Sequence, residues 1–153
     1  PELIGQFQAS RKAEGAALQR ILAGTVQQMD ELIGQAQDTL EGRAERFEEN
    51  FRAAVARLKQ EVEPERLAQE MAILAVKSDI TEEIDRLQAH VAAAQALLTS
   101  DLPSGRKLDF LMQEFNREAN TLCSKSSSTA LTAIGLEMKV LIDQMREQVQ
   151  NVE

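Results

Sequence analysis

Two glutamates, Glu114 and Glu118, stand four residues apart in a segment with helical spacing of its apolar residues. On a helix the two carboxylates project from the same side. Such a pair can share a divalent cation and leave coordination positions for water. The sequence therefore predicts Glu114 and Glu118 as metal ligands and as catalytic residues. The alternative is that intrahelical salt bridges, for example from Glu114 to Arg117 or from Arg106 to Asp109, use these charges in a packed bundle.

A second set of polar side chains surrounds the only histidine of the chain. Asp79, Glu83, Arg86 and His90 share one face of the preceding predicted helix. Imidazole titrates near neutral pH, so His90 is a candidate general base, general acid or metal ligand. The alternative is a histidine that is merely exposed or satisfied by neighbours.

The short segment 100–105 indicates that these two helices are antiparallel neighbours. We therefore expect Glu83, His90, Glu114 and Glu118 to form one cluster. Arg and Lys side chains beside the carboxylates, including Arg106 and Lys107 at the start of the helix, suit the binding of phosphate groups.

The elements that must position these residues are all helical. Apolar residues recur at helical spacing over 8–60, 65–76, 80–99, 106–124 and 129–151, and no strand-like alternation occurs. The fold class predicted is all-α, an elongated helical bundle with long coiled-coil-like helices. Residues 1–62 are expected to be an assembly region, either one long helix or a helical hairpin broken between Gly34 and Gly42. Residues 63–153 are expected to be a helical domain.

Composition narrows the classes of function. The formal net charge is −8, which argues against non-specific nucleic-acid binding by the bulk surface. A single cysteine, Cys123, excludes an intrachain disulfide. No apolar run approaches about 18 residues and no signal peptide is visible, so a cytoplasmic location without a membrane partner is expected. The sequence has no P-loop, HExxH or GxSxG motif.

Aromatic platforms for nucleobases are scarce. The chain has five phenylalanines and no tryptophan or tyrosine. Most of the phenylalanines fall on predicted core stripes, and Phe110 is the one that lies off the seam of its helix. Recognition of a nucleic acid is therefore expected to use phosphates and shape, with little base specificity.

Three segments, KSDITEEIDRLQAH (77–90), GRKLDFLMQEFNREANTLCSKS (105–126) and EMKVLIDQMREQVQNVE (137–153), resemble the C-terminal region of the YicC family of bacterial proteins. The resemblance implies a cytoplasmic endoribonuclease that uses a divalent metal, Mn²⁺ or Mg²⁺, and assembles as a homo-oligomer. Full-length members carry a further N-terminal domain, so the chain is expected to be the C-terminal portion. At two places it departs from the family pattern. Cys123 stands where relatives often have glycine, and the run 126–129 (SSST) stands where relatives tend to have acidic residues or asparagine.

Within the matching motifs the resemblance suggests a role for each polar residue. Glu83, Glu114 and Glu118 are expected to hold the metal, and His90, Glu114 and Glu118 to act in catalysis. The residues expected to bind RNA are Arg106, Lys107, Asn116, Arg117, Asn120 and Lys125. The four cations are expected to contact phosphates, and the two asparagines to hold the network of polar side chains around them.

Two functions are weighed. The first is metal-assisted cleavage of RNA phosphodiester bonds, by hydrolysis or by attack of the ribose 2′-OH with His90 as base; no DNA substrate is expected. The second is a coiled-coil oligomerisation module without catalytic activity, in which buried salt bridges and amides of 106–124 specify partner register.

Overall fold

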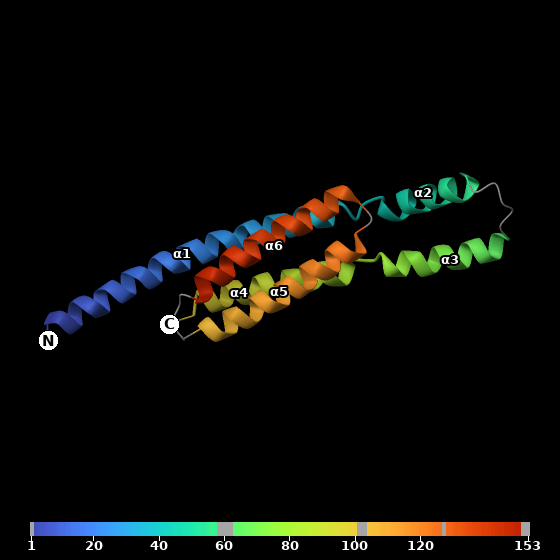
Figure 1. Ribbon diagram of the computed structural model, residues 1–153. Coiled ribbons are helices and arrows are strands. Elements are labelled where there is room, and N and C mark those ends of the chain that lie inside the picture. Colours follow the sequence, from blue (N-terminus) through green and yellow to red (C-terminus); the bar gives the residue numbers. More distant parts are fainter. Residues whose placement is uncertain (1, 58–62, 101–103, 127, 151–153) are drawn as a thin grey trace.

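The computed structural model describes residues 2–57, 63–100, 104–126 and 128–150, and these residues form six helices without a strand (Figure 1). The all-α prediction is thus confirmed. The helices are α1 (Glu2–Asp38), α2 (Arg43–Arg57), α3 (Pro64–Lys77), α4 (Thr81–Leu98), α5 (Gly105–Lys125) and α6 (Thr129–Gln150). None of them is long and apolar enough to cross a membrane.

Four of the helices make a bundle. α5 packs against α4 and α6, and α1 packs against the same two helices, which closes the ring. α4, α5 and α6 alternate in direction, as the short connections between them require, and α1 runs opposite to both α4 and α6 (Figure 1).

The core of the bundle consists of the apolar stripes that helical spacing predicts. On α4 the buried seam includes Ile84, Leu87 and Val91. Phe115 of α5 is completely buried, and aliphatic and methionine side chains fill most of the remaining interior. Burial of one such side chain contributes about 1.5–3 kcal/mol, so these stripes hold α4 and α5 in fixed register.

α1 contributes to this core from Leu22 to Ala36. Residues 3–16, by contrast, are exposed, and this part of α1 extends beyond the other helices (Figure 1). Part of the predicted assembly region therefore shares its core with the predicted helical domain. The division at residue 62 stays a prediction.

The first helical stretch breaks where its glycines suggest. α1 ends at Asp38, and after a turn α2 begins at Arg43. Gly42 has a φ of 63°, a left-handed conformation that glycine adopts without steric cost. The chain then continues away from the bundle as α2 and returns as α3 (Figure 1). Pro64 occupies the first turn of α3, where its missing N–H is not needed.

Candidate metal centre

α4 and α5 present their polar residues along the edge of a shared apolar seam. His90 precedes the buried Val91 on α4, and Glu114 precedes the buried Phe115 on α5. Because the two helices are antiparallel neighbours, the residues that border the seam on one helix face those on the other. This packing agrees with the expectation from the sequence that the polar sides of these two helices lie next to each other.

The structure brings His90, Glu114 and Glu118 together. One ligand atom from each lies within 4.8 Å of the others. Glu118 is only 2% exposed, whereas the other two are half-buried. One imidazole and two carboxylates at this spacing can bind a divalent cation, with Glu118 supplying a buried oxygen and Glu114 the more accessible one. We refer to His90, Glu114 and Glu118 as the triad.

Packing fixes the imidazole of His90. Its ring stands edge-on to the ring of Phe115, with centroids 5.6 Å apart and an interplanar angle of 71°. Its Nε2 atom is buried and has no hydrogen-bond partner among the described residues. A buried polar atom without a partner is costly, so this nitrogen is available to a ligand.

Arg86 neutralises the buried side of the triad. Its Nη1 atom lies 3.4 Å from Oε1 of Glu118, and its Nη2 atom pairs with Glu82. The hydrogen bond to Glu118, with the charges of Glu82 and Glu118, raises the pKa of Arg86. Sequence reasoning placed Arg86 on this face of α4 but gave it no role, since its partner on α5 depends on the register between the helices.

Glu83 belongs to a second cluster, nearer the α2 end of the bundle. Its Oε1 atom lies 2.8 Å from Nζ of Lys125, and its carboxylate is 5% exposed. Arg43 of α2 donates a hydrogen bond to the carbonyl of Lys125. The converging ligand atoms of the triad do not include Glu83, and Lys125, expected at an RNA phosphate, pairs with Glu83 instead.

Charges next to this cluster act on Asp79, just before α4. The backbone N–H and the hydroxyl of Thr81 donate to its carboxylate and, with help from the cations of Lys125 and Arg43, lower its pKa. Burial lowers the pKa of Arg43. Nothing in the local sequence around Arg43 signals its contact with α5.

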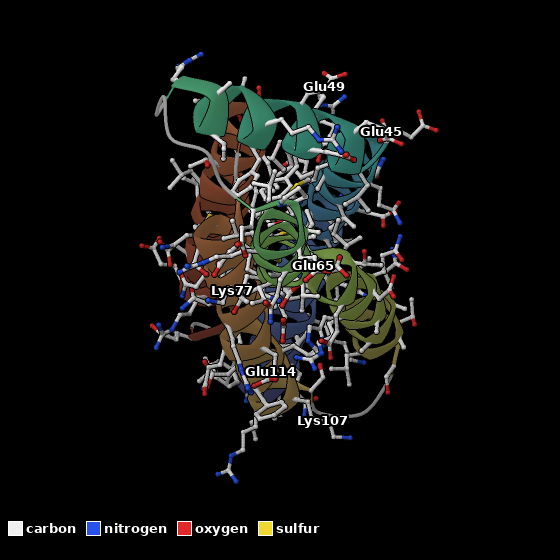
Figure 2. All side chains as sticks on the ribbon, turned by 90° about the vertical axis from the view of Figure 1, so that its right-hand side faces the viewer. Glu45, Glu49, Glu65, Lys77, Lys107 and Glu114 are labelled. Atoms are coloured by element: carbon white, nitrogen blue, oxygen red, sulfur yellow. The ribbon has the colours of Figure 1, made fainter. Side chains whose placement is uncertain are left out.

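The other predicted RNA-binding residues lie at different places on α5. Arg106 and Lys107 are exposed at its start, and Figure 2 shows Lys107 and Glu114 on the same side of the molecule, away from Glu45 and Glu49 of α2. Arg117 is exposed one turn after Glu114.

The two asparagines do not join the triad. Asn116 is two residues from both Glu114 and Glu118, so it lies about 160° around the helix from each. Asn120 is two residues beyond Glu118 and points away in the same manner. Both are exposed.

The ion pairs along the described part of α5 bear on the salt-bridge alternative. Asp109 accepts a hydrogen bond from Gln113, and Glu118 pairs with Arg86 of α4. Among the described residues, the ion pairs that α5 makes therefore join it to α4. Bridges from Arg106 to Asp109 or from Glu114 to Arg117 are not among them.

The comparison with protein families bears on this geometry. The family described as "Endoribonuclease YicC-like, C-terminal" matches residues 33–153, a range that includes the triad and its surroundings. The chain belongs to this family. The match begins within α1, further toward the N-terminus than the first resembling segment, 77–90.

Individual relatives agree with this assignment. The chain is 43% identical over 156 aligned residues to a protein of Haemophilus influenzae named "Probable endoribonuclease YicC", with 99% of this chain and 53% of the relative covered. A protein of the same name from Clostridioides difficile is 48% identical over 92 residues, 60% of this chain and 31% of the relative. The chain spans about half the length of the first relative.

Proposed function

We propose that this chain carries the metal centre of a divalent-metal-dependent endoribonuclease. The observation behind the proposal is the convergence of His90, Glu114 and Glu118 within 4.8 Å. The names of the relatives, both "Probable endoribonuclease YicC", support RNA as the substrate. We propose a cytoplasmic location for the protein, which is compatible with cleavage of RNA.

The donor set suits the cation that this activity requires. Carboxylate oxygens match both Mn²⁺ and Mg²⁺, whereas Mg²⁺ seldom takes a nitrogen ligand. The buried, unpartnered Nε2 of His90 favours a cation that accepts imidazole. Mn²⁺ therefore fits these residues better than Mg²⁺. A cation bound here supplies Lewis-acid stabilisation of the charge that develops on the phosphate.

The protein residues divide the remaining work. Arg86 holds Glu118 and keeps a positive charge beside the two carboxylates. Glu114, the more accessible carboxylate, accepts the proton of the attacking oxygen. Lys107 and Arg117, on exposed turns of α5 before and after Glu114, bind neighbouring phosphates of the RNA.

The test is cleavage of an end-labelled RNA by the chain and by the full-length protein, with Mn²⁺, with Mg²⁺ and with chelator. We expect cleavage with Mn²⁺, weaker cleavage with Mg²⁺ and none with chelator. Glu114→Gln and Glu118→Gln should each lower the rate by at least about 10²-fold, since each removes a charged ligand. Glu137→Gln, an exposed charge loss on α6, serves as the matched control.

Two results would contradict the proposal: equal cleavage with and without chelator, and full activity of both glutamine variants. The ends of the products separate the two reaction routes. A 2′,3′-cyclic phosphate indicates attack by the ribose 2′-OH, and a linear phosphate without that intermediate indicates attack by water.

We also propose that the chain assembles as a homo-oligomer, which is compatible with catalysis. Large apolar side chains are exposed on the projecting part of α1 and near the end of α3: Leu3 and Phe7 on α1 are 82% and 63% exposed, and Val76 on α3 is 75% exposed. Contiguous apolar patches mark interaction surfaces. Light scattering after gel filtration tests this, and a monomer at all concentrations would contradict it.

A further inference from the structure

Phe110 is exposed on the face of α5 that leads to the triad. Its side chain is 60% exposed, unlike that of Phe115, which is fully buried in the same helix. Phe110 lies four residues, about one helical turn, before Glu114, a rise of about 6 Å along the axis. An exposed aromatic ring at this distance from a candidate catalytic carboxylate is the feature from which the inference starts.

A groove of about 560 Å³ lies beside this ring. Its floor and walls are mainly small or apolar, with Ala93, Ala96 and Leu97 from α4 and Leu111 from α5. Ala93 follows His90 by one turn of α4, so the groove continues the α4–α5 seam from the triad toward the start of α5. The groove and the triad are therefore neighbouring sections of one surface.

Two cations border the groove. Arg106 and Lys107 line it together with Phe110, and both are exposed. In Figure 2, Lys107 lies on the same side of the molecule as Glu114. On a chain with net charge −8, an apolar groove with an aromatic ring and two cations is locally complementary to a ligand with a flat apolar part and negative charges.

We propose that this groove is a nucleotide subsite, in which Phe110 stacks on an unpaired base of the RNA while Arg106 and Lys107 contact its phosphates. The inference rests on the proposed function, because it names the part of the substrate that lies next to the cleaved bond. Stacking on an aromatic side chain requires a base that is free of its own helix, so the subsite selects unpaired RNA over duplex RNA.

This subsite would add one stacking contact to the expected recognition by phosphates and shape, which carries little base specificity. That expectation followed from the small number of aromatic residues, most of them on core stripes. A single exposed ring is sufficient for one stacking contact, and every base offers a flat face to it. The subsite therefore adds selectivity for unpaired nucleotides with little preference among the four bases.

Binding of a short single-stranded oligoribonucleotide, measured by fluorescence anisotropy in the presence of chelator, tests the role of the ring. Phe110→Ala should weaken binding by about five-fold to 150-fold, the range for loss of one stacked base. Phe110→Tyr should retain the affinity, whereas Phe110→Leu, apolar but not aromatic, should lose it. Leu136→Ala, at a 55%-exposed position of α6, is the matched control and should bind as the unaltered chain does.

Phe110→Trp gives a direct signature, because the chain has no other tryptophan. Stacking with a base should quench its fluorescence when the single strand is added. A duplex of the same sequence, and inorganic polyphosphate, should leave it unchanged. Unaltered affinity of Phe110→Ala or Phe110→Leu, or equal quenching by the duplex, would overturn the proposal, as would no quenching at all.

The same experiment separates this inference from the proposed function. Quenching and affinity are measured without a divalent metal and without cleavage. A chain that stacks the base but never cuts RNA would contradict the proposed function and support the subsite. A chain that cuts RNA with unaltered affinity in Phe110→Ala would do the opposite.

Discussion

At the scale of the residue, Arg86 determines how the chain tolerates two adjacent carboxylates when no cation is bound. It pairs with Glu118, which is almost completely buried, and with the exposed Glu82. Carboxylates this close repel each other, and a buried charge without a partner is unfavourable. Arg86 and a bound cation therefore stabilise the triad in the same way, by placing positive charge beside its carboxylates.

Arg86→Gln should lower the thermal midpoint in chelator and enlarge the stabilisation produced by Mn²⁺, because the cation then supplies the missing charge. Differential scanning fluorimetry with and without Mn²⁺ measures both effects. Arg66→Gln, an exposed charge loss on α3, is the control. An equal rise with Mn²⁺ in the Arg86 variant and the unaltered chain would refute this account of Arg86.

Lys125 is the partner on which the buried Glu83 depends. Lys125→Ala leaves that carboxylate in the interior without a countercharge, which should cost about 3 kcal/mol in the free energy of unfolding. Replacement of both residues, Glu83→Leu with Lys125→Met, should recover most of the loss. Urea unfolding measures these values. A Lys125→Ala variant within about 0.5 kcal/mol of the unaltered chain would show that solvent, not Lys125, stabilises Glu83.

At the scale of the element, the start of α4 depends on Asp79. Its carboxylate accepts two hydrogen bonds from Thr81, at 2.9 Å from the backbone nitrogen and 2.7 Å from the hydroxyl. Asp79→Ala should destabilise the chain by about 1 kcal/mol at neutral pH, because both hydrogen bonds to the first residue of α4 are lost.

The lowered pKa of Asp79 gives this prediction a pH dependence. The folded chain binds the proton less tightly than the unfolded chain, so the ionised carboxylate adds stability that is complete above its ordinary value of 3.8. That contribution disappears as the pH falls through the lower pKa of the folded chain. The difference between Asp79→Ala and the unaltered chain should therefore shrink in acid, and a constant difference from pH 7 to pH 3 would contradict it.

The contact between α5 and α6 depends on a close approach at Gly135. A Cβ atom at this position would lie 2.4 Å from Sγ of Cys123 and 3.3 Å from Cδ2 of Leu122. Gly135→Ala should therefore destabilise the bundle by about 1–3 kcal/mol in spite of its better helix propensity.

Cys123→Ala should relieve much of this overpacking, so the two substitutions should couple by about 0.5–3 kcal/mol in a double-mutant cycle of urea unfolding. Additive effects would show that the sulfur is not what limits the approach of α6.

The helices themselves were predictable because each carries its own signals. Pro64 begins α3, where a proline suits the first turn, and the apolar seam of α4 follows from the spacing of Ile84, Leu87 and Val91. The adjacency of His90 to the two glutamates also followed, because a short connection leaves α4 and α5 few ways to pair. The ion-pair partners of Arg86 and Glu83 could not be predicted from the sequence, because they depend on how far one helix is shifted along the other.

At the scale of the whole molecule, α1 consists of two sections in different environments. Its section from Leu22 to Ala36 completes the bundle core, whereas residues 3–16 extend from it and are exposed. Sequence periodicity continues through both sections. The periodicity therefore predicts the helix. It does not show which part of the apolar stripe of α1 packs against other helices, because those helices lie more than 40 residues further along the chain.

A variant that begins at Gly15 should keep the thermal midpoint of the full chain, because the deleted residues bury little apolar surface. Met29→Ala, in contrast, removes a fully buried side chain and should cost about 2–5 kcal/mol. Circular dichroism during heating distinguishes them. A large loss of stability in the shortened chain would show that the projecting section supports the bundle.

The account as a whole depends on the triad being a cation site. Titration of the chain with Mn²⁺, followed by the loss of the electron paramagnetic resonance signal of free Mn²⁺, measures this most directly. We predict saturable binding to the unaltered chain that is lost or weakened at least about ten-fold in His90→Ala and in Glu118→Gln. Binding of Mn²⁺ to both variants with the affinity of the unaltered chain would contradict the account.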